Sequence, residues 1–154
     1  MNGITKALVL IVVLAIGGAD SAYSAESFRV SQLKIVSGAQ HHVFVVEMAE
    51  TPAQRSLGLQ WRRQMAPNQG MLFDFGSPIP VTMWMKNTNL SLDMLFISEN
   101  GTIINIARNT KPLSLDYVNS AGRAKGVLEV LAGTAKKLKI KAGDRVVHAV
   151  FNNQ

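Results

Sequence analysis

The chain has 154 residues, of which 47% are hydrophobic, and its formal net charge is +6. It contains no cysteine, so disulfides, thiol nucleophiles and thiolate metal ligands are excluded and the hydrophobic core must hold the fold together. In the cytoplasm, a net positive charge of this size would suggest that the protein binds nucleic acid. Outside it, the counter-charges are anionic lipids, lipopolysaccharide, peptidoglycan carboxylates or an acidic protein, unless the charge serves only solubility.

The first residues have the features of an export leader. Lys6 and the amino terminus form a positively charged amino-terminal region. The apolar run 7–19 that follows has the length of the hydrophobic core of a signal peptide. The run is shorter than the roughly 20 apolar residues of a spanning helix, and Gly17 and Gly18 interrupt it. No cysteine follows, which excludes a lipoprotein anchor. We therefore expect cleavage.

Small residues mark the expected cleavage site. Ala22 and Ser24 fit the positions that signal peptidase requires, and Ala19 and Ser21 offer an earlier cut. The chain then divides into two parts: a cleaved signal peptide, 1–24, and a single β-rich domain, 25–154. We expect the mature domain to be soluble, periplasmic or secreted, and without a stable membrane anchor.

Most of the remaining chain is predicted to be strand. Segments rich in Val, Ile, Met and Phe and bounded by turn residues are typical of short strands. Eight such segments occur: 28–36, 41–49, 70–75, 81–85, 92–98, 102–108, 125–131 and 145–151. Glu99-Asn100-Gly101 predicts a tight hairpin turn between two of them, because Asn and Gly tolerate positive φ.

Helix is predicted only in two short pieces. Thr51 is placed to cap the first, with Pro52 at its first position and Gly58 at its end. The second is expected after Gly133, with Thr134 as its cap. The fold class is therefore mainly β: a compact single-domain barrel or sandwich of about eight short strands with two short helices.

The segment 81–88 carries the most suggestive pattern. Strand alternation places Thr82, Trp84 and Lys86 on one face. Trp84 offers a flat apolar surface with one N–H donor, and Lys86 adds a charge with three donors, a combination suited to a sugar or an anionic small molecule. In that case we expect Trp84 to be partly exposed. The alternative is structural, with Trp84 in the core and Lys86 paired with a carboxylate.

Three acids interrupt otherwise apolar strands. Glu47, Asp93 and Glu129 each share a strand face with branched aliphatic residues. They either lie at strand ends in water or form a polar cluster with Lys86 and Arg108. Two carboxylates and a lysine could perform acid-base chemistry, although a structural ion-pair network is the commoner outcome. For Asp93, we expect hydrogen bonds from the 87–89 loop or a pair with Lys86.

Other chemistry has no sequence support. The chain lacks a phosphate-binding glycine loop, a G-x-S-x-G turn and an H-E-x-x-H motif. His41 and His42 are neighbours in a predicted strand and point to opposite faces, so no metal or other cofactor is expected. Few aromatic residues are present to stack bases, so no nucleic-acid partner is expected. The lysines of 136–141 form either a solvated face or a patch for an anionic envelope surface.

Several runs together resemble a known family. They are 58–63, 70–75, 83–88, 92–97, 127–130, 132–133 and 140–146. They are similar to the bacterial and archaeal domain-of-unknown-function family number 192. The resemblance implies a compact, mainly β domain that is often exported and has no established activity, so it supplies no catalytic residues. The family often has Pro at Ser91 and Asp at Ser98 and Asn100, which weakens any role of acids in that hairpin.

The leading hypothesis is a non-catalytic domain that binds a small ligand or an anionic envelope component. The candidate site residues are Trp84, Lys86, Asn87, Thr88, Asp93 and Glu129. One alternative is a hydrolase of envelope polysaccharide, which requires two of the three strand acids to converge in an open cleft. The other is a module that only binds another protein.

Overall fold

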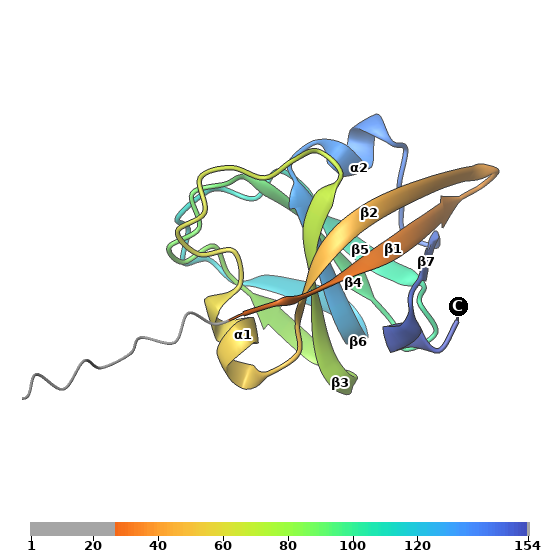
Figure 1. Ribbon diagram of the computed structural model, residues 1–154, viewed down its shortest axis with the longest axis horizontal. Coiled ribbons are helices and arrows are strands. Elements are labelled where there is room, and N and C mark those ends of the chain that lie inside the picture. The colour runs from red at the N-terminus through yellow and green to blue at the C-terminus, as the bar shows by residue number, and fades with distance from the viewer. Residues whose placement is uncertain (1–26, 154) are drawn as a thin grey trace, which may run out of the picture.

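The computed structural model describes residues 27–153, so the expected signal peptide over 1–24 lies outside the described residues. Seven strands form one curled sheet in the order β5-β4-β6-β3-β2-β1-β7 (Figure 1). Their bounds are β1 Arg29–Ser37, β2 Gln40–Ala49, β3 Gln69–Met83, β4 Leu92–Ile97, β5 Ile103–Ala107, β6 Val118–Leu131 and β7 Arg145–Val147. The predicted mainly β class is confirmed.

The sheet curls until its two edges meet at one end. Neighbouring strands pair antiparallel except β2 and β3, which run parallel. At the start of β5, the N–H of Ile103 donates to the Asp144 carbonyl at 2.9 Å, and the N–H of Val146 donates to the Gly101 carbonyl at 2.7 Å. These bonds tie β5 to β7, so the architecture is close to a barrel. The predicted hairpin turn at residues 99–101 joins β4 to β5.

One predicted strand boundary is absent. The segments 70–75 and 81–85 were expected as separate strands, but β3 runs through both and pairs with β6 along both halves. The register slips between Asp74 and Ile79 and again between Pro80 and Thr82. Such irregularities bend a pair of strands without ending their pairing, and proline is tolerated at these positions. At the other end of the chain, β7 is short and is followed by a 3₁₀ turn, Ala149–Phe151.

Helix α1, Pro52–Leu57, has the predicted capping box. The Thr51 hydroxyl accepts the Gln54 N–H at 3.1 Å, and the Gln54 side-chain oxygen accepts the Thr51 N–H at 3.0 Å. Gly58 ends the helix at φ 50°, where an added Cβ would lie 3.2 Å from the ring of Phe73. Glycine is needed here for both its conformation and the close approach.

Helix α2, Thr134–Lys137, is not capped as expected. Gly133, at φ 82°, takes the cap position, and Thr134 is the first helical residue. The reason is that the first turn is capped from elsewhere: the Asp93 carboxyl accepts the Ala135 N–H at 2.9 Å. No helix within residues 27–153 has both the length and the apolar character to cross a membrane.

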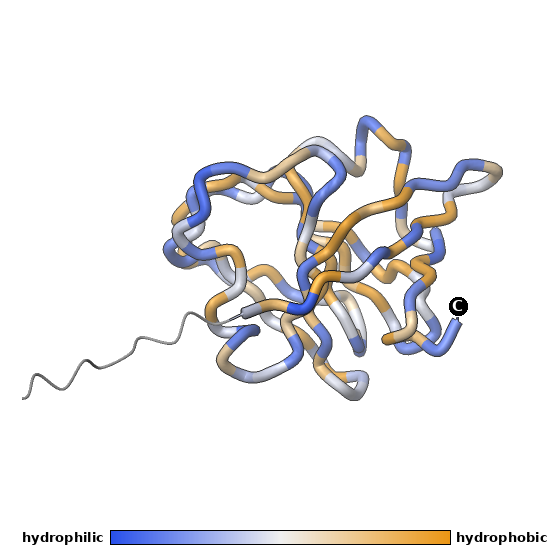
Figure 2. The backbone as a smooth tube through the Cα atoms, in the orientation of Figure 1, coloured by the Kyte–Doolittle hydropathy of each residue, from blue (hydrophilic) through white to orange (hydrophobic). Residues whose placement is uncertain are grey.

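The core occupies both faces of the central strands. One cluster of buried side chains draws on all seven strands, and a second lies on the opposite face of β3, β4 and β6. In Figure 2, hydrophobic stretches run through the strands at the centre of the molecule. All residues of β4 are buried. The second cluster is covered by the later half of β3 and by Leu59 and Met85 from the adjoining loops.

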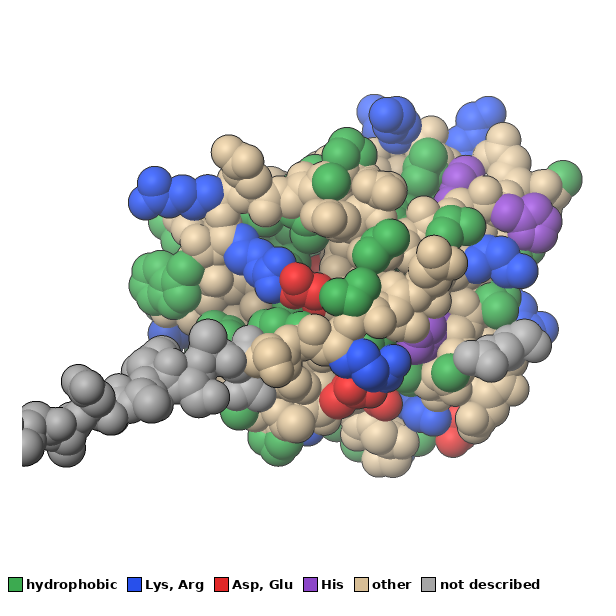
Figure 3. All heavy atoms as spheres, viewed as in Figure 1, with side chains coloured by type: hydrophobic (Ala, Val, Ile, Leu, Met, Phe, Trp, Pro, Cys, Tyr) green, Lys and Arg blue, Asp and Glu red, His purple; other side chains and the backbone are tan. Residues whose placement is uncertain are grey.

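Basic side chains are scattered over the face of the molecule that Figure 3 shows. Some Lys and Arg side chains lie at the edges of this face, and others lie nearer its middle beside acidic side chains. Four lysines near the carboxyl end are exposed: Lys136, Lys137, Lys139 and Lys141. Both predicted roles of that run, a solvated face and a patch for an anionic envelope surface, require this exposure.

Asp93 is a buried structural anchor. Its side chain is fully buried, with one oxygen accepting the N–H of Asn109 at 2.9 Å and the other accepting that of Ala135 at 2.9 Å. The expectation that it binds the 87–89 loop or Lys86 is wrong. Strand alternation turns Asp93 toward the first core cluster, whereas Lys86 lies against Trp84 on the other side of the sheet.

We expect Asp93→Ala to lower the free energy of unfolding by roughly 1 to 3 kcal/mol, because two buried amides lose their acceptor. Urea denaturation of the domain, residues 25–154, measures this effect. Glu99→Ala is the matched control, since Glu99 is an exposed acid in the next turn and its loss is expected to cost less than about 0.5 kcal/mol. Equal stability of the two variants would contradict the anchoring role.

Candidate functional site

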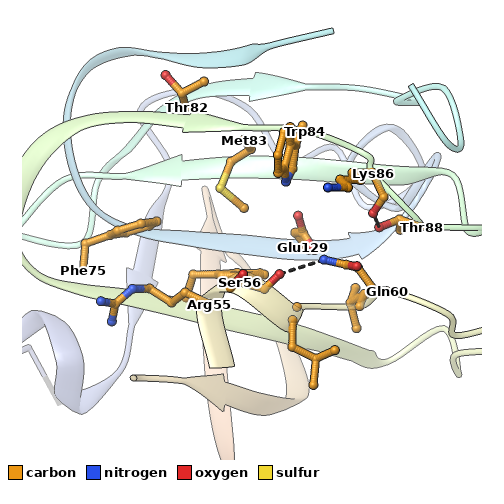
Figure 4. A pocket seen from close by; sticks show the side chains of 14 residues that line it. Arg55, Ser56, Gln60, Phe75, Thr82, Met83, Trp84, Lys86, Thr88 and Glu129 are labelled. Atoms are coloured by element: carbon orange, nitrogen blue, oxygen red, sulfur yellow. Dashed lines mark hydrogen bonds between the residues drawn. The ribbon is translucent and has the colours of Figure 1, made fainter. Parts of the chain in front are cut away.

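A cavity of about 220 Å³ opens on the second face of the sheet. Figure 4 shows its two walls: Thr82, Met83, Trp84 and Lys86 on one side, and Arg55, Ser56 and Gln60 on the other. Glu129 lies between them and points into the space. The first wall is the end of β3 and the loop after it, and the second is α1 with the residues that follow.

Glu129 is a buried acid in an apolar setting. The register places it between Met71 of β3 and Met94 of β4, both fully buried. Glu129 is 4% exposed, and among residues 27–153 no hydrogen-bonding or charged partner offsets its desolvation. Desolvation raises the pKa of Glu129 to about 8. The group is therefore mostly neutral at pH 7, able both to donate and to accept a hydrogen bond.

Trp84 and Lys86 lie together at the mouth of the cavity. Trp84 is 46% exposed, which confirms the expected partial exposure. The Lys86 ammonium lies 5.2 Å from the centre of the Trp84 ring, within the range of a cation–π contact. Ion pairs within residues 27–153 join Arg29 to Glu50 and Arg62 to Glu47, and neither involves Lys86. The alternative of a core tryptophan and a carboxylate-paired lysine is wrong.

The opposite wall is held in place by hydrogen bonds. The Gln60 amide donates to the Ser56 carbonyl at 2.7 Å and accepts from the Asn87 side chain at 3.0 Å. Arg55 donates to the Asp74 carbonyl at 2.8 Å, and its guanidinium lies 5.6 Å from the centre of the Phe75 ring. These side chains are fixed before any ligand arrives, as a binding site requires.

Sequence reasoning missed this second wall. Ser56, Gln60 and Phe75 line the cavity but were not among the candidate residues. Their signal was available, because Gln60 and Phe75 fall in two of the runs that carry the family resemblance. What the sequence does not reveal is that these runs face the segment 81–88 across a cavity.

The structure brings together four of the six candidate residues. Trp84, Lys86, Thr88 and Glu129 line the cavity. Asn87 does not line it and instead binds Gln60 from behind the wall. Asp93, as described above, lies on the opposite face of the sheet.

Strained residues hold the loop that carries Lys86. Trp61, at φ 65°, donates its N–H to the Asn87 carbonyl at 2.8 Å. Leu113, at φ 62°, donates its N–H to the Thr88 carbonyl at 3.1 Å. The left-handed conformation is costly for bulky residues, and both side chains are more than half exposed, so core packing does not compensate the cost. Strain of this kind is concentrated at functional sites.

The three strand acids do not converge. Both oxygens of Glu47 bind the Arg62 guanidinium, and the register puts Met71 between Glu47 and Glu129 on the sheet. Arg108 donates to the Ile140 carbonyl at 2.8 Å rather than to an acid. The alternative in which these acids cluster with Lys86 and Arg108 is therefore wrong, because Glu47 and Arg108 have local partners and Asp93 lies on the other face of the sheet.

No group of three or more His, Cys, Asp and Glu side chains in the described part of the chain is arranged to hold a metal ion. His148 is buried; its Nδ1 accepts the Val150 N–H at 3.2 Å, and its Nε2 lies 3.0 Å from the Ser31 hydroxyl. Burial, helped by the charge of Arg29, lowers the pKa of His148. This histidine is a neutral part of the scaffold.

Residues 33–148 match the model of DUF192, a family described as an uncharacterized ACR. The chain belongs to the DUF192 family. Both walls of the cavity and Glu129 fall inside the matched range.

Two solved structures are similar to this DUF192 chain. A candidate transcription regulator from Sinorhizobium meliloti 1021 is 46% identical with a TM-score of 0.80, and the match covers 82% of this chain and 98% of that one. A protein of unknown function from Novosphingobium aromaticivorans DSM 12444 is 30% identical with a TM-score of 0.77, covering 95% and 100%. No curated protein matches the sequence.

The raised pKa of Glu129 predicts a pH-dependent penalty in this DUF192 domain. Between the ordinary value of 4.5 and about 8, the unfolded chain releases a proton that the folded domain keeps. The free energy of unfolding therefore falls as pH rises, by at most about 1.4 kcal/mol per pH unit for this group. Glu129→Gln removes the titrating group. We expect the stability of this variant relative to wild type to increase across that window.

Denaturation of both proteins at a series of pH values from about 5 to about 9 measures the difference. Glu99→Gln, at an exposed position, is the control and is expected to show no such trend. A stability difference between Glu129→Gln and wild type that stays constant with pH would show that Glu129 ionises normally.

Proposed function

We propose that this domain is a non-catalytic periplasmic binding protein whose cavity takes one ring of an envelope saccharide. The observation that carries the proposal is a buried acid, Glu129, at the base of a cavity whose rim is the exposed Trp84 ring. The proposal rests on the match between these groups and the chemistry of a sugar.

A sugar ring has one face of C–H groups and an edge of hydroxyls. The Trp84 ring offers an apolar surface for the face. A hydroxyl both donates and accepts a hydrogen bond, and a neutral carboxylic acid does the same, so Glu129 can bind one hydroxyl in both directions. Lys86 adds a charged donor at the rim, which suits a ring oxygen or an acidic substituent.

The size of the cavity sets the size of the ligand. At about 220 Å³, it is smaller than the roughly 300 to 1,000 Å³ of sites for drug-sized molecules. It therefore has room for one small ring. Two of its polar side chains, Arg55 and Gln60, are fixed by hydrogen bonds, as is usual where polar groups determine the orientation of a ligand.

Hydrolysis is the less favoured function. Glu129 has the raised pKa of a general acid, but a glycosidase needs a second carboxyl group across the scissile bond. Glu47 is bound to Arg62 and does not line the cavity, and Asp93 lies on the other face of the sheet. Among residues 27–153, the three strand acids therefore do not supply the pair.

A panel of glucose, N-acetylglucosamine and glucuronic acid, read by thermal shift, tests the binding function. A ligand at 100 times its Kd adds about 2.7 kcal/mol to stability. We expect at least one sugar to raise Tm, Trp84→Ala to abolish the rise, and Trp84→Phe to weaken it. Because Trp84 is 46% exposed, the alanine variant is expected to lose less than the roughly 3 to 5 kcal/mol typical of a buried aromatic residue.

Leu115→Ala is the control, because Leu115 is 65% exposed and does not line the cavity. It is expected to bind the sugar as wild type does. The proposal fails if no sugar raises Tm, or if Trp84→Ala binds as well as wild type.

Export has a separate test. The positively charged amino-terminal region and the short apolar run of residues 7–19 support a cleaved leader. Expressed with that leader in a Gram-negative host, the domain is expected in the periplasmic fraction with an amino terminus near Ala25, as read by intact mass. A full-length species that stays in the membrane fraction would contradict the periplasmic assignment.

A further inference from the structure

A second hollow adjoins the first cavity at Trp84. It has a volume of about 270 Å³ and is lined by Thr82, Met83, Trp84 and Tyr117. The first three also line the cavity above Glu129. The two hollows therefore adjoin at these three residues.

The register of the β3–β6 ribbon explains why the two aromatic residues meet. Thr82 pairs with Asn119 and Met83 pairs with Val118, so Trp84 and Tyr117 follow one step beyond the last pair. Directly opposite residues on antiparallel strands share a face, with Cβ atoms about 4.5 to 5.5 Å apart. Both residues accordingly line the same hollow at the end of this ribbon.

The fold does not account for the exposure of these rings. Trp84 is 46% exposed and Tyr117 is 71% exposed, although burial of an aromatic side chain is strongly favourable. Neighbouring exposed aromatic residues beside a hollow are typical of a binding surface. A polar edge completes this one: the Thr82 hydroxyl donates to the Asn119 side-chain oxygen at 2.8 Å, which fixes both groups beside the rings.

We infer that Trp84 and Tyr117 form a second subsite, so that the ligand is an oligosaccharide of at least two rings. The inference rests on the proposed saccharide binding. One ring occupies the cavity above Glu129, the next lies against Tyr117, and the glycosidic bond crosses the edge of Trp84. A chain ligand fits better than a single sugar because the two hollows share Thr82, Met83 and Trp84.

Calorimetric titration of matched mono- and disaccharides tests the subsite. The probes are glucose with cellobiose and N-acetylglucosamine with diacetylchitobiose. For the pair that binds, we expect the disaccharide Kd to be at least tenfold lower than the monosaccharide Kd. Tyr117→Ala is expected to remove that gain and leave the monosaccharide Kd unchanged. Leu115→Ala, at a residue 65% exposed on the same loop and outside both hollows, is expected to change neither Kd.

The outcomes separate the subsite from the proposed function. If the monosaccharide binds and the disaccharide binds no more tightly, the subsite is refuted and the single-ring site stands. The same holds if Tyr117→Ala keeps the full gain. If neither sugar binds, both proposals fail. Loss of anionic-vesicle binding or of self-association in Tyr117→Ala, with sugar binding unaffected, would assign the ring pair to a membrane or protein partner and overturn the inference.

Discussion

Strand β3 stays paired with β6 through two slips of register, and the cavity depends on the bend that these slips produce. The bend lies between Asp74 and Thr82, beyond which the chain returns over the sheet. Val81 then packs in the second core cluster, and Trp84 comes to lie on the cavity wall next to Glu129 (Figure 4). A ribbon without the bend would leave Glu129 open to water, where its pKa would be ordinary.

Glu129 and Asp93 show how the same fold uses a buried acid in two ways. Both side chains are almost wholly buried on central strands. Asp93 accepts two backbone N–H groups, so its burial is compensated and it joins two distant segments. Glu129 has no such partner among the described residues and is kept neutral by desolvation. A group that costs stability without serving the scaffold is a candidate for function.

Local signals in the sequence predicted the local features well. The mainly β class, the α1 capping box, the turn at 99–101 and the exposure of Trp84 all follow from short-range chemistry. Long-range partners could not be predicted in this way. Asp93 binds amides 16 and 42 residues away, and Gly133 replaces Thr134 as the α2 cap because one of those amides belongs to that helix. The continuity of β3 was missed because prolines in its middle are typical of a strand break.

The neutrality of Glu129 is the central claim, since the saccharide chemistry and the pH-dependent penalty both follow from it. The most direct measurement is the carbon-13 chemical shift of the Glu129 carboxyl group in the folded domain, assigned by its absence in Glu129→Gln and followed through a pH titration. We expect a midpoint at about 8. A midpoint near the ordinary 4.5 would mean that the carboxyl is ionised at neutral pH, and the account of the cavity as a site for a hydroxyl-bearing ring would be contradicted.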